Sequence, residues 1–232
     1  MAFSERTGGV SPPPYDSLNL GFTRDDPALV RVNRRRTCTA LRIRSFSRGW
    51  QVHGAGVALV GSALGGAGFL DPESAIPGTD ALVTERPGIA LSILTADCVP
   101  VAIADASSAR VAVIHAGWRG IVAGIIPAAL GYFDAAARPR AVIGPAIGPD
   151  HYEVGEDVAR TVSRAAAGSA LIHRRGGRAF IDLPATVAQM LEALGGLVID
   201  RAEECTACEP SRFFSYRRDG VTGRQALIAM RW

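Results

Sequence analysis

Short apolar runs separated by turn-forming residues dominate the pattern of this chain. Runs rich in β-branched residues predict strands, because alternating or continuous apolar positions fit a buried sheet. The expected strands cover residues 50–53, 57–60, 79–84, 89–94, 99–104, 110–115, 141–143, 179–181 and 225–230.

Helical patterns are fewer. Asp26 and Pro27 supply an N-cap and a first-turn proline, which predict a helix at about 26–41. Apolar positions at helical spacing predict further helices at 117–133, near 155–167 and from Pro184 onward.

The order of these elements indicates the fold class. Consecutive strands followed by helices, without a regular strand–helix–strand rhythm, favour an α+β fold with a mixed sheet packed by helices. The chain shows no internal repeat and no break in composition, so we expect one domain over residues 1–232. The stretch 61–77 is rich in Gly and Ala, and we expect a surface loop there, with a lid as the alternative.

Composition and charge exclude several classes of partner and cofactor chemistry. The 232 residues are 48% hydrophobic with a formal charge of +3, which indicates a globular protein and no nucleic-acid partner. The chain lacks an apolar signal segment and any run of membrane-spanning length, so we expect no membrane association. Few, scattered cysteines favour a cytoplasmic location. All 25 basic residues are Arg, which excludes a Schiff-base lysine and leaves phosphate binding to Arg and backbone amides.

Three metal-seeking side chains stand where apolar runs give way to turns. They are His53, Cys98 and His115. Two imidazoles and one thiolate leave one position of a tetrahedral zinc open, which is typical of a catalytic site. The three lie far apart in the sequence and form no local metal signature, so a shared metal is a hypothesis. The alternatives are a hydrogen-bonded, half-buried histidine and a small core cysteine.

Cys205 and Cys208 form a competing pair. Their two-residue gap is usual in a structural zinc knuckle or a redox motif, but the chain has no second such pair. The alternative is a reduced pair in a tight turn. In a non-enzymatic reading, His151 or Cys205 would close the metal site as a fourth ligand.

Recognisable motifs follow one another along nearly the whole chain. They lie at 3–11, 14–15, 17–21, 25–27, 33–34, 51–54, 79–81, 95–100, 115–120, 143–148, 205–208 and 213–218. In this order they resemble the laccase-domain (YfiH-type) family, whose members are called polyphenol oxidase, peptidoglycan editing factor or multifunctional purine nucleoside phosphorylase. The resemblance implies a layered α/β/β/α arrangement of mixed sheets. It also implies one active-site zinc on His53, Cys98 and His115.

The leading functional hypothesis rests on this resemblance. It is a zinc-dependent purine nucleoside phosphorylase acting on adenosine, inosine, guanosine and S-methyl-5'-thioadenosine, with adenosine deaminase as a second activity. A zinc-bound water of lowered pKa would attack the purine C6 in deamination. No obligate protein partner is expected.

Further residues are candidates for this chemistry. Arg34 and Arg119, with the helix amides after Gly117, would hold phosphate, and Asp97 would orient a ligand or relay a proton. Together with His53, Cys98 and His115, Asp97 completes the catalytic candidates. The structural alternatives are a solvated helix face for Arg34, a helix-capping or ion-pairing role for Arg119 and a turn for Asp97.

Two other functions stay open. Cys98, activated by His115 or His53, would be the nucleophile of a hydrolase that edits peptidoglycan precursors. Alternatively, one copper at the same site would give weak phenol oxidation. A true multicopper oxidase is excluded, because its several copper centres need more imidazoles than the four histidines present.

Overall fold

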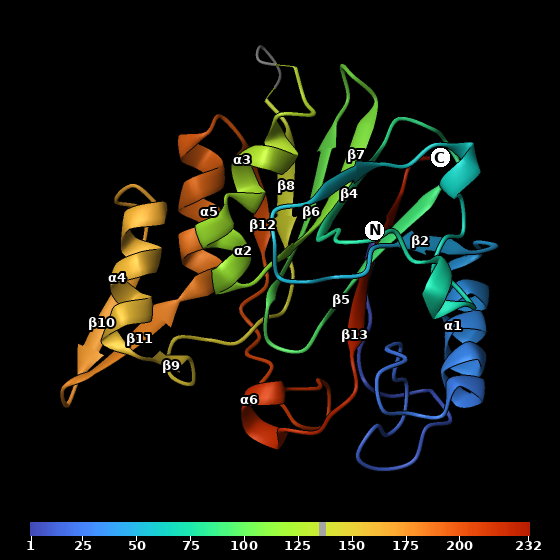
Figure 1. Cartoon of the computed structure of the whole chain (residues 1–232), viewed down its shortest axis with the longest axis horizontal. Coiled ribbons are helices and arrows are strands. Elements are labelled where there is room, and N and C mark those ends of the chain that lie inside the picture. Colours follow the sequence, from blue (N-terminus) through green and yellow to red (C-terminus); the bar gives the residue numbers. More distant parts are fainter. Residues whose placement is uncertain (135–137) are drawn as a thin grey trace.

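Two mixed β-sheets, stacked face to face, form the centre of the molecule (Figure 1). The computed structural model describes residues 1–134 and 138–232. One sheet has the strand order β12-β8-β6-β7-β4-β3, and the other has the order β1-β13-β5-β2. The bounds are β1 Ala2–Phe3, β2 Phe46–Arg48, β3 Val57–Leu59, β4 Ala81–Thr84, β5 Ala90–Thr95, β6 Val99–Asp105, β7 Arg110–Ala116, β8 Arg140–Ile143, β12 Leu197–Arg201 and β13 Gln225–Met230.

The layer between the two sheets consists of buried apolar side chains. Leu82 of β4 and Leu227 of β13 are fully buried in it. Ala81 and Val83, the neighbours of Leu82, point the other way, into the core beneath the helices. Successive strand residues alternate between faces, and both faces are covered, so the central strands read as continuous apolar runs.

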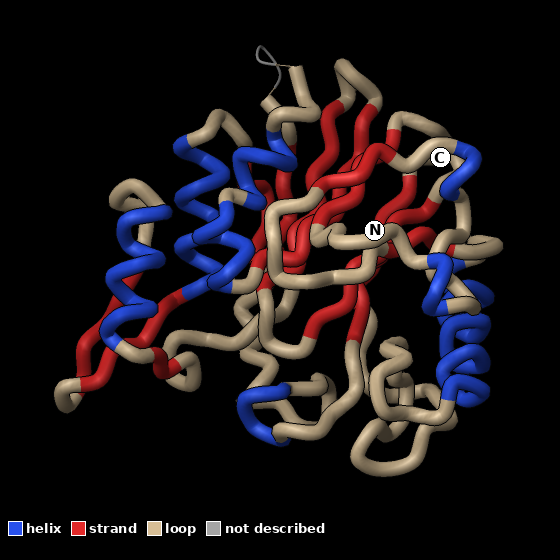
Figure 2. Tube along the Cα trace, in the orientation of Figure 1, coloured by secondary structure: helices blue, strands red, loops and turns tan. Residues whose placement is uncertain are grey.

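Helices cover the two outer faces (Figure 1). The helices α2 Trp118–Ala123, α3 Ile125–Leu130, α4 Glu156–Ala165 and α5 Leu183–Ala193 flank the six-stranded sheet, and α1 Pro27–Leu41 flanks the four-stranded sheet. Figure 2 shows the same order, with strands in the middle and helices at the flanks. This arrangement confirms the expected α+β fold with α/β/β/α layers.

A small antiparallel sheet, β10-β11-β9, extends the helical flank beside α4. Its strands are β9 Glu153–Val154, β10 Leu171–Arg175 and β11 Arg178–Asp182. A last helix, α6 Tyr216–Asp219, precedes β13. None of the described helices combines the length and the hydrophobicity that a membrane crossing requires.

The N-terminal helix forms as expected. The Asp26 side chain accepts a hydrogen bond from the Ala28 amide at 2.8 Å, and α1 begins at Pro27. The stretch 61–77 is also a loop, apart from single turns at Ser62–Leu64 and Pro72–Ser74.

The prediction of a strand at 50–53 is wrong. The chain leaves the sheet after β2, and His53 has φ 59°, in the left-handed region. The amides of Val52, His53 and Gly54 bond to the Asp80 carboxylate instead of to a neighbouring strand. A single buried side chain thus replaces the ladder that the apolar pattern predicted.

The single helix expected at 117–133 is also wrong. The structure has two short helices, α2 and α3, that meet at Gly124. Gly124 has φ 89°, a left-handed conformation that terminates α2 and that glycine adopts without strain. The strands β2, β10 and β12 were not predicted, because their exposed or short patterns resemble loops.

Candidate metal centre

His53, Cys98 and His115 converge from three separate segments. Cys98 immediately precedes β6, and His115 lies near the end of β7. These two strands are antiparallel, with Pro100 opposite His115, so the register places Cys98 beside the histidine. The loop before β3 adds His53, whose ring centroid lies 4.8 Å from that of His115. The ligand atoms of all three residues lie within 4.8 Å of one another.

Asp80 fixes the geometry of both histidines. Its fully buried carboxylate lies 2.8 Å from Nδ1 of His115 and accepts the backbone amide of His53 at 3.0 Å. Burial opposes its ionisation, but hydrogen bonds from His115, Gly54 and Val52 lower the pKa of Asp80. The carboxylate therefore holds the proton of His115 on Nδ1, which leaves Nε2 free as a ligand.

The charges within the group are strongly coupled. Burial opposes ionisation of the Cys98 thiol, but the neighbouring His115 and His53 outweigh it and lower the pKa of Cys98 to about 6. For His115, burial disfavours the charged imidazolium and so lowers the pKa. The neighbouring Cys98 and Asp80 outweigh this effect and raise the pKa of His115 to about 9. Cys98 and His115 therefore each favour the charged form of the other.

The donor set fits a soft divalent cation. One thiolate and two imidazoles are the ligands that zinc prefers, and Asp80 supplies the carboxylate that commonly orients a zinc-bound histidine. Gly117 leaves room beside them, because a Cβ there would lie 2.9 Å from Cys98 Sγ and 3.1 Å from His53 Cδ2. His151 and Cys205, the alternative fourth ligands, group with Cys208 instead.

Tyr152 and Arg224, from distant segments, lie close enough to Cys98 to feel its charge. Burial and the charge of Cys98 raise the pKa of Tyr152, which therefore stays a neutral phenol. The guanidinium of Arg217 stacks over the Tyr152 ring at 5.0 Å, and Arg119 is close enough to act on the same phenol electrostatically. Burial lowers the pKa of Arg224, whereas nearby Cys98 raises it. The surroundings of the metal ligands are thus rich in arginine.

Arg119 is exposed on α2, and its guanidinium stacks on Trp118 at 4.5 Å. It lies in the first turn of α2, four residues after His115, and its contact to phosphate stays a prediction. The helix that carries it spans only Trp118–Ala123, so the amide array expected after Gly117 is short.

Asp97 lies beside the metal ligands and is buried. Its two carboxylate oxygens accept hydrogen bonds from the Thr206 hydroxyl at 2.7 Å and from the Arg217 amide at 2.6 Å. Its own backbone has φ 97°. Asp97 therefore joins the loop of Cys98 to the C-terminal segment.

Arg34 does not join the group. It is fully buried, and its guanidinium donates hydrogen bonds to the carbonyls of Leu20, Gly68 and Phe69 while lying over the Phe22 ring at 4.3 Å. These contacts occupy the guanidinium inside the protein. They correct the expectation of a solvated or phosphate-binding Arg34, because such a side chain must reach solvent.

Comparison with known proteins decides the family. The model of the multi-copper polyphenol oxidoreductase laccase family matches residues 1–231. The chain belongs to this family. A Streptomyces coelicolor protein named purine nucleoside phosphorylase is 41% identical over 97% of the chain and 93% of its own length. The purine nucleoside phosphorylase YfiH of Escherichia coli is 38% identical, over 96% and 90%.

Solved structures agree. The crystal structure of the hypothetical protein YfiH from Bacillus licheniformis superposes with a TM-score of 0.92 at 31% identity, covering 99% of this chain and 91% of that one. YlmD from Geobacillus stearothermophilus gives 0.89 at 32% identity, over 99% and 91%. The laccase-family fold therefore extends over the whole described chain.

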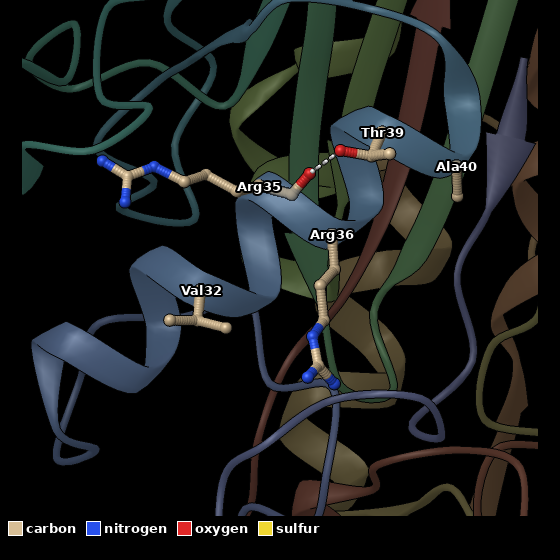
Figure 3. A pocket seen from close by; sticks show the side chains of 5 residues that line it. All are labelled: Val32, Arg35, Arg36, Thr39 and Ala40. Atoms are coloured by element: carbon tan, nitrogen blue, oxygen red, sulfur yellow. Dashed lines mark hydrogen bonds between the residues drawn. The ribbon is translucent and has the colours of Figure 1, made fainter.

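A shallow depression lies elsewhere in this laccase-family protein, on the exposed face of α1 (Figure 3). Val32, Arg35, Arg36, Thr39 and Ala40 line it. Figure 3 shows Arg35 and Arg36 pointing in different directions, and the latter reaches the carbonyls of Gly8 and Gly9. The depression contains none of the metal-ligand candidates.

Several residues of the laccase-family site escaped sequence reasoning. Asp80 belongs to a motif at 79–81, but nothing in its spacing assigned it a role. Tyr152, Arg217 and Arg224 come from segments remote from the ligands, so only the fold brings them near Cys98. The position of an acidic residue directly before an apolar strand was the available sequence signal for Asp80.

Proposed function

We propose that this protein is a cytoplasmic, zinc-dependent purine nucleoside phosphorylase. Its substrates would be adenosine, inosine, guanosine and S-methyl-5'-thioadenosine with phosphate, and adenosine deamination would be a second activity. The observation that carries the proposal is the convergence of His53, Cys98 and His115 within 4.8 Å of one another. Relatives named purine nucleoside phosphorylase support the proposal, because this chain matches them over 93% and 90% of their length.

The protein's own residues would position the metal and the substrate. His53, Cys98 and His115 would hold the ion, and Asp80 would keep the Nε2 atom of His115 directed at it. When bound, zinc would supply Lewis-acid polarisation of the purine or of a water molecule. Tyr152 stays protonated and would donate a hydrogen bond to the substrate.

Phosphorolysis breaks the bond between the purine nitrogen and C1' of the ribose while a phosphate oxygen bonds to C1'. The purine leaves with the bonding electron pair and takes up the proton that the phosphate gives up. Arg119 would hold this phosphate through charge-assisted hydrogen bonds, which stabilise the negative charges that meet in the transition state. Asp97 would act as a positioning residue, because both of its oxygens already bind Thr206 and Arg217.

A phosphate-dependence assay tests the proposal. Purified protein of known metal content is incubated with adenosine or inosine, with and without phosphate, and the products are separated by chromatography. The proposal expects free base and ribose 1-phosphate only with phosphate, and inosine from adenosine without it. Zinc-loaded protein that yields neither product would overturn it.

Metal dependence is tested in the same assay. We expect a strong chelator to abolish phosphorolysis and added zinc to restore it. A protein that keeps its full rate after verified zinc removal would contradict the metal requirement. A separate sample loaded with copper at the same site tests the oxidase alternative. We expect weak phenol oxidation from the copper form and phosphorolysis from the zinc form.

The ionised Cys98 favours a second candidate, a cysteine-dependent hydrolase that edits peptidoglycan precursors. A thiol whose pKa falls to about 6 beside an imidazolium is an activated nucleophile. Such an enzyme would survive chelation and be inactivated by alkylation of Cys98. The zinc phosphorylase would instead lose its activity to the chelator and regain it with zinc.

A further inference from the structure

A second group of soft metal ligands lies outside the site of His53, Cys98 and His115. His151, Cys205 and Cys208 each offer a ligand atom, and these atoms lie within 4.8 Å of one another. The histidine comes from the loop between β8 and β9, whereas both cysteines belong to the segment between β12 and α6. The fold therefore brings an imidazole against the Cys-x-x-Cys pair from a remote part of the chain.

The backbone holds Cys205 in a suitable position. The Gly148 amide donates a hydrogen bond to Cys205 Sγ at 3.1 Å, a contact that stabilises a thiolate. The Cys208 amide donates to the Cys205 carbonyl at 3.1 Å, so the pair forms a tight turn. A bridge between Ala146 and Cys205 fixes this turn against the loop that carries His151.

The surroundings favour a cation that exchanges with solvent. His151 and Cys208 are exposed, and Cys205 is half-buried. An ion can therefore reach the exposed His151 and Cys208 directly from solvent. The neighbouring carboxylates of Asp150 and Glu209 are already paired with Arg175 and Arg212, so the soft side chains are the available ligands.

We propose that His151, Cys205 and Cys208 bind a second divalent cation of the zinc class. Two thiolates and one imidazole are a soft donor set that selects zinc over magnesium or calcium, with one position left for water. The cysteines lose their thiol protons to solvent when the ion binds. No redox step is involved.

This ion joins two segments that frame the first site. His151 directly precedes Tyr152, which lies near Cys98. Thr206 directly follows Cys205, and its buried hydroxyl donates to Asp97 at 2.7 Å. A cation on His151 and Cys205 therefore clamps the loop after β8 to the segment after β12, and both contribute to the surroundings of Cys98.

Metal stoichiometry under reducing conditions tests the second site. Each protein is loaded with zinc, freed of excess by gel filtration and analysed for bound metal. We expect two equivalents in the parent protein, one in Cys208→Ser, one in His151→Ala and one in Cys98→Ser. The control Cys38→Ala removes a buried thiol of α1 and should keep two. One equivalent in the parent protein, lost completely in Cys98→Ser, would overturn the proposal.

Cobalt and thermal unfolding give independent readouts. In cobalt-loaded Cys98→Ser, thiolate-to-cobalt absorption should persist, and adding Cys208→Ser should abolish it. A chelator should lower the Tm of Cys98→Ser and leave that of the double variant unchanged, because only a bound ion stabilises by mass action. Equal Tm values with and without chelator in Cys98→Ser, or a Cys205–Cys208 disulfide that persists in reductant, would refute the clamp.

Discussion

Asp80 organises the metal centre more than any other single residue. Its carboxylate holds the ring of His115 and three consecutive amides of the His53 loop. One buried anion thus sets the orientation of one histidine and the backbone position of the other. A histidine and a loop that are held in advance lose little freedom when a metal binds.

Asp80→Asn should weaken metal binding about 10–100-fold, because the neutral amide no longer fixes the Nδ1 proton of His115. Competition against a chelator of known affinity measures the change. Asp105→Asn is the control, since Asp105 is the last residue of β6 and its side chain accepts hydrogen bonds from Ser107 and Ser108. Equal metal affinity in Asp80→Asn and the parent protein would show that the carboxylate does not orient the ligand.

Arg119, the exposed arginine that the sequence singled out for phosphate, should differ in its response to mutation from an exposed arginine on α1. Arg119→Ala should raise KM for phosphate about tenfold or more, since a charge-assisted hydrogen bond contributes about 1.5–3 kcal/mol. Arg36→Ala, on the exposed face of α1, should leave KM unchanged. Steady-state kinetics at varied phosphate distinguish them, and an unchanged KM in Arg119→Ala would remove Arg119 from the phosphate site.

Arg34→Ala should act on stability instead. The substitution leaves the buried carbonyls of Leu20, Gly68 and Phe69 without a hydrogen-bond donor. The free energy of unfolding should therefore fall by at least about 3 kcal/mol. Urea unfolding measures this loss. A stable variant with a raised KM for phosphate would show that Arg34 serves the substrate after all.

At the level of elements, Gly124 divides one predicted helix into α2 and α3. Gly124→Ala should lower the free energy of unfolding by about 1 kcal/mol or more, because alanine is strained at its φ of 89°. The nearest atom to a Cβ at this position is Pro127 Cγ at 3.8 Å, an ordinary van der Waals contact, so the cost is conformational rather than steric. Gly131→Ala, at φ −59° after α3, is the matched control and should be nearly neutral. Similar losses in both variants would argue against the left-handed conformation at Gly124.

The turn between β6 and β7 should add a pH dependence to stability. Hydrogen bonds from Ser108 and Ser107 lower the pKa of Asp105 to about 2. The carboxylate is therefore more acidic in the folded than in the unfolded protein, where its pKa is about 3.9. Its contribution is present above about pH 4 and is lost as the pH falls toward about 2. Urea unfolding across this range should show a shallower decline in Asp105→Asn than in the parent protein, and parallel curves would contradict the shift.

At the scale of the whole molecule, the layer between the two sheets joins halves that are far apart in sequence. Leu227 of β13 is fully buried there with Leu82 of β4. Leu227→Ala should lower the free energy of unfolding by about 2–5 kcal/mol. Leu197→Ala, at a side chain 50% exposed, should cost far less. Equal costs in chemical denaturation would mean that the inter-sheet layer does not stabilise the molecule.

The sequence by itself determined the fold class, the central strands and the first set of candidate metal ligands. The strands at 99–104, 110–115 and 225–230 were predictable because both of their faces are buried, which makes local pattern and tertiary environment agree. His53, Cys98 and His115 were recognisable because few side chains in this chain bind soft metals.

Only the tertiary structure decided how these residues are supported. The His53 loop, the second cluster around Cys205 and the buried place of Arg34 all depend on contacts between remote segments. A local pattern records which residues prefer burial, but it does not record which distant carbonyl, amide or carboxylate will meet them. Those partners are set by the stacking of the two sheets and by the loops that this stacking brings to one edge.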